Sequence, residues 1–288
     1  MDVGFFSYFC NMLEKMTRAV CEIAKEAGAY IREERKKFSL ASVERKHTHD
    51  YVSYVDKGSE KRIVCALRKL LPEAGFITEE GTTKTDESSN LKTPASNLVW
   101  VVDPLDGTTN FIHQYAPYAV SIALLRGKEI LLGVVYEICQ DECFYAWKDG
   151  GAFVERENDK GERVNVKLQV TANRIDDALL CVQLPYNSEA YKPVVKHLID
   201  RLYGNVGSIR MCGSAAMALC YVAAGRLDGY VEKYIGQWDF MAGALMVKEA
   251  GGKVTDYQGS DDFTQGNSVV ATNGIVQQDL LDVIGELQ

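Results

Sequence analysis

Residues 100–110 read Trp-Val-Val-Asp-Pro-Leu-Asp-Gly-Thr-Thr-Asn, and this stretch decides both the fold class and the chemistry. Residues 98–102 are almost entirely apolar, which predicts a strand that is covered on both faces. Two acids, Asp103 and Asp106, follow with a proline and a leucine between them. Because both stand at the end of one strand with a turn between them, we expect their carboxylates to point at one spot.

Such a pair of carboxylates needs a proton or a cation. Two unit charges about 4 Å apart repel by about 4 kcal/mol at an effective dielectric constant of about 20. Hard oxygen ligands suit Mg²⁺ or Mn²⁺. Gly107 lets the backbone approach a ligand, and Thr108 and Thr109 supply hydroxyl and N–H groups where a helix begins, which is typical of an anion site. The structural alternative, an Asp-Pro turn followed by an Asp helix cap, explains one acid but not both acids with the glycine.

Further acids stand where other strands end or helices begin. Glu79 and Glu80 follow a short apolar strand, and Glu232 ends another. Asp56 and Asp239 stand at the starts of helices. Taken singly, these acids are explained as a surface turn, an edge-strand acid and helix caps. Open α/β sheets bind ligands beyond their strand ends, so the recurrence predicts one shared site.

Apolar periodicity predicts the other elements, and the pattern changes along the chain. We expect helices over residues 11–36, 57–71, 190–202, 214–224 and 240–250. We expect strands over residues 75–78, 119–126, 130–136, 142–148, 179–183, 208–210 and 229–232, and polar loops over 44–50 and 82–97. The first half predicts a mixed, largely antiparallel sheet flanked by the early helices, and the second half predicts strand–helix alternation. The whole is an α/β (α+β) fold of two lobes, residues 1–150 and 151–288.

Composition narrows the partners and the compartment. Of the 288 residues, 47% are hydrophobic and 25% are charged, which is typical of a globular protein. The 32 basic and 40 acidic residues give a net charge of −8, which disfavours nucleic acid and anionic membranes. No apolar stretch reaches the roughly 18 residues of a membrane span, and no basic segment opens a signal peptide. The 8 cysteines form no CxxC pair, so we expect a reduced, cytoplasmic protein.

Three motifs together resemble the inositol monophosphatase family of magnesium-dependent, lithium-sensitive phosphatases. They are Glu79-Glu80, the segment Asp-Pro-Leu-Asp-Gly-Thr-Thr-Asn at residues 103–110, and Trp238-Asp239 before a helix that ends in Glu-Ala-Gly-Gly. The resemblance covers about residues 12–280 and implies a layered αβαβα sandwich of two tightly packed lobes and a homodimer. One departure is Thr78, which stands where relatives usually carry glycine before the acid pair.

The resemblance also implies roles for the matching residues. The metal ligands would be Glu79, Asp103, the backbone carbonyl of Leu105, Asp106 and Asp239, holding two or three Mg²⁺ ions per subunit. The catalytic residues would be Thr108 and Asp56, which orient and deprotonate the attacking water, with Glu80 assisting. The substrate contacts would be Asp106, Gly107, Thr108, Gly213, Ser214, Ala215, Glu232 and Lys46, the last a mobile basic residue that closes over the site.

These implications predict a Mg²⁺-dependent phosphomonoesterase that hydrolyses inositol monophosphate to inositol and phosphate by metal-activated water. The same chemistry on fructose 1,6-bisphosphate, adenosine 3′,5′-bisphosphate, a phosphorylated amino alcohol or another small sugar phosphate is the alternative. The pair Thr109-Asn110 argues against nucleotide phosphatases, which typically carry lysine after Asp-Gly-Thr. Glu232 favours a polyol. A non-catalytic metal-binding module would be expected to lack one of the ligand carboxylates, and none is missing.

Overall fold

Strand β4 (Leu98–Asp106) lies inside a seven-stranded sheet, between β3 (Gly75–Thr78) and β5 (Ala119–Arg126). Helix α2 (Tyr54–Leu70) packs on one face of β4, and helix α6 (Gln237–Glu249) packs on the other. The computed structural model describes residues 3–39, 43–47, 50–82, 97–184 and 188–287. The prediction that β4 is covered on both faces is confirmed, and this burial explains the unbroken apolar run.

The seven-stranded sheet is mixed but mainly antiparallel, as predicted. Strand β3 runs parallel to β4, and every other neighbouring pair is antiparallel. Beyond β5 the order follows the sequence through β6 (Glu129–Glu137), β7 (Glu142–Trp147), β8 (Gly151–Glu157) and β9 (Arg163–Lys167). Strands β8 and β9 thus belong to this sheet although they follow residue 150, and the predicted boundary between two lobes at that residue stays a prediction.

The second sheet has five strands in the order β11-β10-β12-β14-β13. Strand β10 is the parallel neighbour of both β11 and β12, whereas β14 runs antiparallel to β12 and β13. Their bounds are β10 (Leu179–Val182), β11 (Ser208–Arg210), β12 (Gly229–Lys233), β13 (Lys253–Thr255) and β14 (Ser268–Thr272). The predicted strand–helix alternation therefore builds a mixed sheet. In it β11, β10 and β12 are parallel neighbours, and β14 runs antiparallel to the strands on either side of it.

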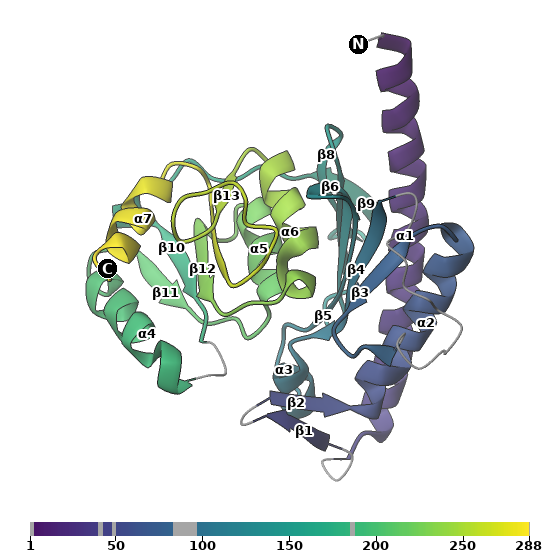
Figure 1. The fold of residues 1–288 in the computed structure, drawn as a ribbon, viewed down its shortest axis with the longest axis horizontal. Coiled ribbons are helices and arrows are strands. Elements are labelled where there is room, and N and C mark those ends of the chain that lie inside the picture. Colours follow the sequence, from purple (N-terminus) through teal and green to yellow (C-terminus); the bar gives the residue numbers. More distant parts are fainter. Residues whose placement is uncertain (1–2, 40–42, 48–49, 83–96, 185–187, 288) are drawn as a thin grey trace.

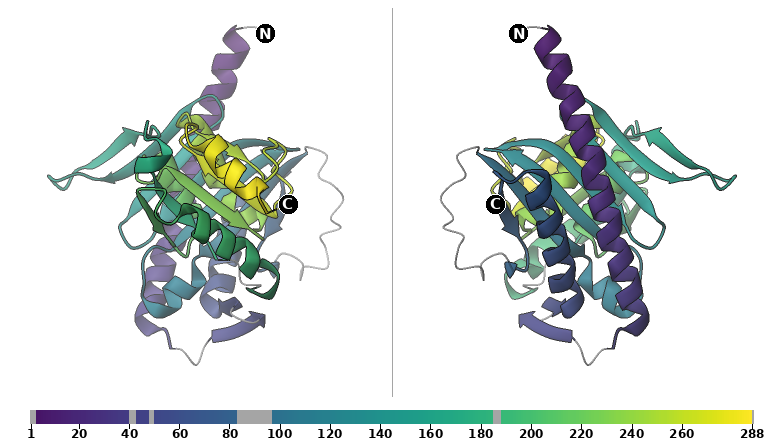
Figure 2. Two further views of the ribbon diagram at one scale, coloured as in Figure 1. Left: turned by 90° about the vertical axis from the view of Figure 1, so that its left-hand side faces the viewer. Right: turned by 90° about the vertical axis from the view of Figure 1, so that its right-hand side faces the viewer.

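Helices separate and cover the two sheets in five layers (Figure 1). Helices α1 (Val3–Lys37) and α2 cover the outer face of the first sheet, and α1 crosses it diagonally (Figure 2). Helices α5 (Ala215–Ala223) and α6 lie between the sheets. Helices α4 (Ser188–Leu202) and α7 (Gln277–Gly285) cover the second sheet from outside. The layered αβαβα sandwich implied by the family resemblance is confirmed.

Alternate side chains of β4 enter different cores. Trp100 and Val102 are buried against α1 and α2, whereas Val101 belongs to the cluster around α5 and α6. A third cluster, with Leu198 and Leu280, lies between the second sheet and its outer helices. Each sheet therefore buries both faces, which stabilises it by roughly 25 cal/mol for each Å² of apolar surface removed from water.

Two predictions about local structure are wrong. The stretch at residues 44–50, predicted as an exposed loop, contains β1 (Val43–His47), which pairs antiparallel with β2 (Asp50–Ser53). Helix α6 begins at Gln237 rather than near residue 240, so Asp239 is not the N-cap residue but lies inside the first turn, where it accepts the N–H of the N-cap residue Gly236. The polar loop predicted at residues 82–97 lies almost wholly outside the described residues.

No helix among the described residues combines the length and the apolar character that a bilayer crossing needs. All eight cysteines lie in the described part of the chain and are free thiols. The cytoplasmic location stays a prediction.

Candidate active site

The end of β4 turns sharply so that both of its acids face the same space. Pairing with β5 is irregular between Asp103 and Asp106, where the Asp-Pro-Leu-Asp segment leaves the ladder. The Leu105 N–H donates to Oδ1 of Asp103 at 2.9 Å, which holds the turn closed. Gly107 then takes φ +84°, a left-handed conformation that favours glycine, before α3 (Thr108–His113) begins.

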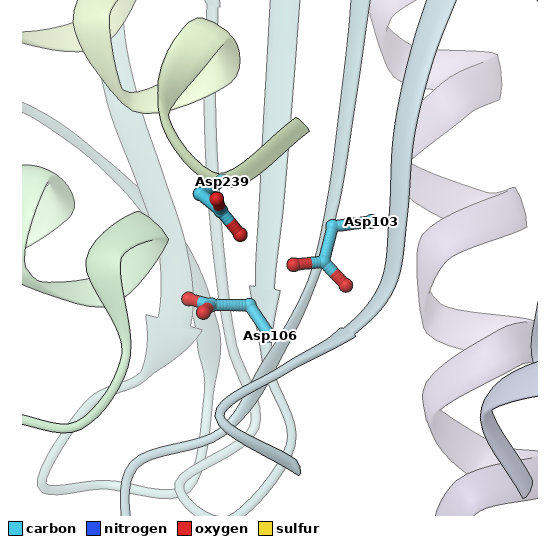
Figure 3. Close-up of side chains that lie close together, drawn as sticks. All are labelled: Asp103, Asp106 and Asp239. Atoms are coloured by element: carbon cyan, nitrogen blue, oxygen red, sulfur yellow. The ribbon is translucent and has the colours of Figure 1, made fainter. Parts of the chain in front are cut away.

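A third aspartate comes from the other side of the molecule. The first turn of α6 brings Asp239 opposite Asp103 and Asp106 (Figure 3). One carboxylate oxygen from each residue lies within 4.8 Å of the others. Asp239 lies more than a hundred positions after Asp103 and Asp106 in the sequence, and the contact of α6 with the first sheet brings it to them.

The three carboxylates of this triad repel one another unless a proton or a cation compensates their charge. Burial raises the pKa of Asp103 well above its usual range, and the charges of Glu79, Asp106 and Asp239 raise it further. Burial likewise raises the pKa of Asp239, and it raises that of Asp106 to about 6. Buried like charges at this separation repel strongly unless a proton or a metal compensates them. A cluster of hard carboxylate oxygens fits Mg²⁺.

Hydrogen bonds also fix the carboxylates of Asp106 and Asp239. Ser214, the N-cap residue of α5, donates its hydroxyl to Oδ2 of Asp106, and the Ala216 N–H donates to the same oxygen at 2.8 Å. Oδ2 of Asp239 accepts the Gly236 N–H at 2.8 Å. Asp106 stands at the end of the first sheet and is held by a helix from the second half of the chain, so the site depends on how the two halves pack.

Asp56 and Thr108 form a second, adjoining unit. The Thr108 hydroxyl lies 2.9 Å from Oδ1 of Asp56 and 3.0 Å from the Leu105 carbonyl oxygen. The other carboxylate oxygen of Asp56 accepts the N–H of Ser53 at 2.8 Å and its hydroxyl at 2.6 Å. Burial raises the pKa of Asp56. Asp56 also caps a helix, as the structural alternative expects, because Ser53 and Asp56 form the capping box of α2. The same side chain accepts the hydrogen bond from the Thr108 hydroxyl.

One cavity of about 630 Å³ gathers most of the predicted site. Ten of the predicted residues line it, namely Glu79, Asp103, Leu105, Asp106, Gly107, Thr108, Gly213, Ala215, Glu232 and Asp239. Asp56 and Ser214 do not line it but hold residues that do. The backbone of Lys46 lies in β1, and its side chain lies outside the described part of the structure.

The acid pair after β3 is held by a residue that the sequence did not single out. Glu60, on α2, is fully buried and accepts the Glu80 N–H at 2.8 Å and the Thr82 N–H at 2.6 Å. Glu79 lines the cavity, so Thr78 in place of glycine does not turn it away. Glu80 does not line the cavity, and its assisting role stays a prediction. Because its neighbours in the sequence are charged, Glu60 has the pattern of a solvent-exposed helix position in the sequence alone.

Asn110 joins the two halves of the site. Its side-chain amide donates to the Pro117 carbonyl at 2.8 Å and to the Cys212 carbonyl at 2.9 Å. The next residue, Gly213, has φ +72°, and a Cβ there would come within 2.7 Å of the Asn110 side chain. The run Thr-Thr-Asn at the start of α3 therefore positions the chain before α5, which no local sequence signal revealed.

Glu232 lies in the same cavity on β12. It is 9% exposed, and the Tyr230 hydroxyl donates to its carboxylate. Burial raises its pKa to about 8. Whether protonated or ionised, a carboxyl group at this position has further acceptor capacity for hydroxyl groups that enter the cavity.

Comparisons with known proteins identify the family to which this chain belongs. The sequence model of the inositol monophosphatase family matches residues 12–287. An inositol-1-monophosphatase from Mesorhizobium japonicum is 35% identical over 93% of this chain and 96% of its own, and the Nus factor SuhB of Escherichia coli is 33% identical over 93% and 95%. The crystal structure of the extragenic suppressor protein SuhB from Bartonella henselae superposes with a TM-score of 0.81 at 34% identity, covering 93% of this chain and 97% of that one. The chain therefore belongs to the inositol monophosphatase family, a family of metal-dependent phosphatases.

Proposed function

We propose that this protein is a Mg²⁺-dependent phosphomonoesterase that hydrolyses inositol monophosphate to inositol and phosphate. The observation that carries the proposal is the meeting of Asp103, Asp106 and Asp239 beside the left-handed turn at Gly107. A cation bound by the acids and N–H groups offered by the turn together suit a phosphate ester.

The metal ligands we propose are Glu79, Asp103, the Leu105 carbonyl, Asp106 and Asp239, holding two or three ions per subunit. Support comes from their place in one cavity and from the raised pKa of Asp103, which like charges around it increase. When bound, Mg²⁺ lowers the pKa of coordinated water and neutralises charge on the phosphate.

The chain's own groups would then orient the reactants. The Thr108 hydroxyl, which donates to Asp56 at 2.9 Å, would accept a hydrogen bond from the attacking water, and the proton of the water would pass through this hydroxyl to Asp56. Burial raises the pKa of Asp56, which makes its carboxylate a stronger proton acceptor. The N–H groups of Gly107 and Thr108 bind the phosphate oxygens. No covalent link to the enzyme is needed.

Selection of a polyol rests on the opposite wall of the cavity. Glu232 would accept hydrogen bonds from inositol hydroxyls, and Gly213, Ser214 and Ala215 would shape that wall. Lys46 would close over the bound phosphate. A dimer and the absence of a nucleic-acid partner stay predictions, the latter because one relative is named a Nus factor.

A phosphate-release screen tests the substrate. Purified protein with Mg²⁺ is given inositol 1-phosphate, fructose 1,6-bisphosphate, adenosine 3′,5′-bisphosphate and p-nitrophenyl phosphate. We expect the highest kcat/KM on inositol 1-phosphate. A higher value on fructose 1,6-bisphosphate would move the assignment to that sugar while retaining the chemistry.

The variant Glu232→Gln tests the polyol contact. The substitution replaces one carboxyl oxygen by an NH₂ group, which cannot accept a hydrogen bond, so KM for inositol 1-phosphate should rise about tenfold. The KM for p-nitrophenyl phosphate, which has no hydroxyls, should change little. Equal changes for the two esters would remove Glu232 from substrate recognition.

A further inference from the structure

One wall of the cavity is formed where two neighbouring strands of the second sheet come to their carboxyl ends. Strands β10 and β12 are parallel, and Val182 lies beside Val231 in their register. Both valines are buried in the cluster under the outer helices. Because side chains alternate along a strand, the next residues, Gln183 and Glu232, point to the opposite face, toward α5 and α6. They therefore stand side by side, and both line the cavity.

Hydrogen bonds set how Gln183 presents its side-chain amide. Its backbone N–H donates to the Val231 carbonyl at 3.1 Å, so the chain keeps its place beside β12 through this residue. The Gly213 N–H donates to Oε1 of Gln183 at 3.2 Å. A backbone N–H can only donate, so the amide oxygen faces Gly213 and the NH₂ group is turned away from it. In the described part of the chain no group accepts a hydrogen bond from this NH₂, which leaves it free to donate to a molecule in the cavity.

Glu232 supplies the complementary chemistry beside it. Its buried carboxyl group accepts the Tyr230 hydroxyl and retains capacity to accept from a second group. Neighbouring strands lie about 4.8 Å apart, so the two side chains can reach hydroxyls on adjacent carbon atoms of one molecule. A hydroxyl group can both donate and accept. One hydroxyl can therefore donate to Glu232 while its neighbour accepts from Gln183.

An amide suits this position better than a second acid. Burial and the charge of Asp106 raise the pKa of Glu232 to about 8, so negative charge is already unfavourable on this wall. Gln183 adds a donor without adding charge. A leaving group without hydroxyls would leave both the donor and the acceptor unpaired, and a polar site discriminates in this way against analogues that lack a hydroxyl.

We propose that Gln183 is a specificity-determining residue, which donates to one hydroxyl of the leaving group while Glu232 accepts from the hydroxyl on the adjacent carbon. The proposal deepens the function proposed above and rests on it. The substrate class it names is phosphate monoesters of alcohols that carry hydroxyls on adjacent carbons, of which inositol is a cyclic member.

Binding of two matched phosphonates tests Gln183 without turnover. In these compounds a CH₂ group replaces the ester oxygen of inositol 1-phosphate and of cyclohexyl phosphate, so they cannot be hydrolysed and differ only in the hydroxyls on their ring. With Mg²⁺ present, calorimetry measures the ratio of the two Kd values. The natural protein should bind the inositol compound about thirtyfold more tightly. In Gln183→Glu, where an oxygen replaces the donor NH₂, the ratio should fall to about threefold.

Two further variants separate recognition from a structural role and from charge. Gln183→Glu retains an acceptor for the Gly213 N–H, whereas Gln183→Met removes both the acceptor and the donor. A ratio that stays natural in Gln183→Glu and falls only in Gln183→Met would show that Gln183 merely positions Gly213, and would overturn the proposal. Gln258→Glu adds the same charge at an exposed residue that does not line the cavity, and it should leave the ratio unchanged. A fall of equal size in Gln258→Glu would also overturn the proposal.

Phosphate release from inositol 1-phosphate, measured on the same preparations, separates this proposal from the phosphatase itself. A Kd ratio near one in the natural protein, or no binding of either phosphonate, would overturn the role of Gln183. Release by the natural protein together with an unchanged ratio in Gln183→Glu contradicts the role of Gln183 alone. The expected fall in the ratio without any phosphate release contradicts the phosphatase alone.

Discussion

At the scale of a residue, Ser214 shows how one hydroxyl supports both a helix and a carboxylate. It donates to Asp106 and accepts the Met217 N–H at 3.3 Å as the cap of α5. In Ser214→Ala the loss of a hydrogen bond to a charged group should lower kcat/KM for inositol 1-phosphate about tenfold, and the lost cap should reduce the free energy of unfolding by about 1 kcal/mol. Phosphate release and urea unfolding measure both effects. Ser214→Thr, which keeps the hydroxyl, is the control, and unchanged activity in Ser214→Ala would show that the bond to Asp106 has no functional role.

Single residues were predictable from the sequence where their side chains suit a ligand and where they belong to a family motif. Asp103 and Asp106 were recognisable from the sequence because they end a buried strand, and Asp239 because it follows a tryptophan that the family motif contains. Glu60 was not, since charged neighbours make a buried glutamate look exposed. The bridging role of Asn110 was not either, because only the fold brings the start of α3 next to the Cys212 carbonyl.

At the scale of an element, the turn between β4 and α3 depends on the backbone of Gly107. A side chain there would be strained at φ +84°, and its Cβ would come 3.1 Å from the Gly213 carbonyl oxygen. Gly107→Ala should therefore reduce the free energy of unfolding by about 1–3 kcal/mol and also lower activity on inositol 1-phosphate. Gly127→Ala, at φ +62° with no atom within 4 Å of the new Cβ, should lose stability but keep activity. Wild-type kcat in Gly107→Ala would argue against a turn that approaches the phosphate.

Elements were predictable where burial set a clear period. The strand before Asp103 and the helices with one apolar face follow from the sequence alone. The hairpin of β1 and β2 does not, because charged side chains on short strands give the composition of a loop. The start of α6 was placed too late because Asp239 is a common cap residue, whereas in the structure it accepts the Gly236 N–H from inside the first turn.

At the scale of the whole molecule, the acidic site sets how stability depends on pH. Burial raises the pKa of Asp103, Asp239, Asp106 and Glu232, the last two to about 6 and about 8. Their ordinary values are about 4. The metal-free folded protein therefore holds protons that the unfolded chain has lost, so this contribution to stability is full below about pH 4 and is lost as pH rises through the raised values.

Thermal unfolding checks this expectation. The metal-free protein should have a higher Tm at pH 5.5 than at pH 8.5, and Mg²⁺ should raise Tm more at pH 8.5, where the acids are ionised. Asp103→Asn, which removes one buried charge, should have a smaller difference in Tm between pH 5.5 and pH 8.5, and Mg²⁺ should raise its Tm by less. A metal-free Tm that rises from pH 5.5 to pH 8.5 would show that other groups dominate.

The layering of the whole molecule was predictable mainly through the motifs, because local patterns do not say which helix lies between two sheets. The contacts of α6 with the first sheet, which bring Asp239 to β4, depend on the packing of residues more than a hundred positions apart.

We propose that the converging aspartates make this protein a metal-dependent phosphatase. The most direct test measures phosphate release from inositol 1-phosphate by the natural protein and by Asp103→Asn. The natural protein with Mg²⁺ should release phosphate, and excess chelator should abolish this. Asp103→Asn should fold with an unchanged circular dichroism spectrum and lose at least about a hundredfold in kcat/KM. Full activity in Asp103→Asn, or in the natural protein with chelator present, would contradict the claim.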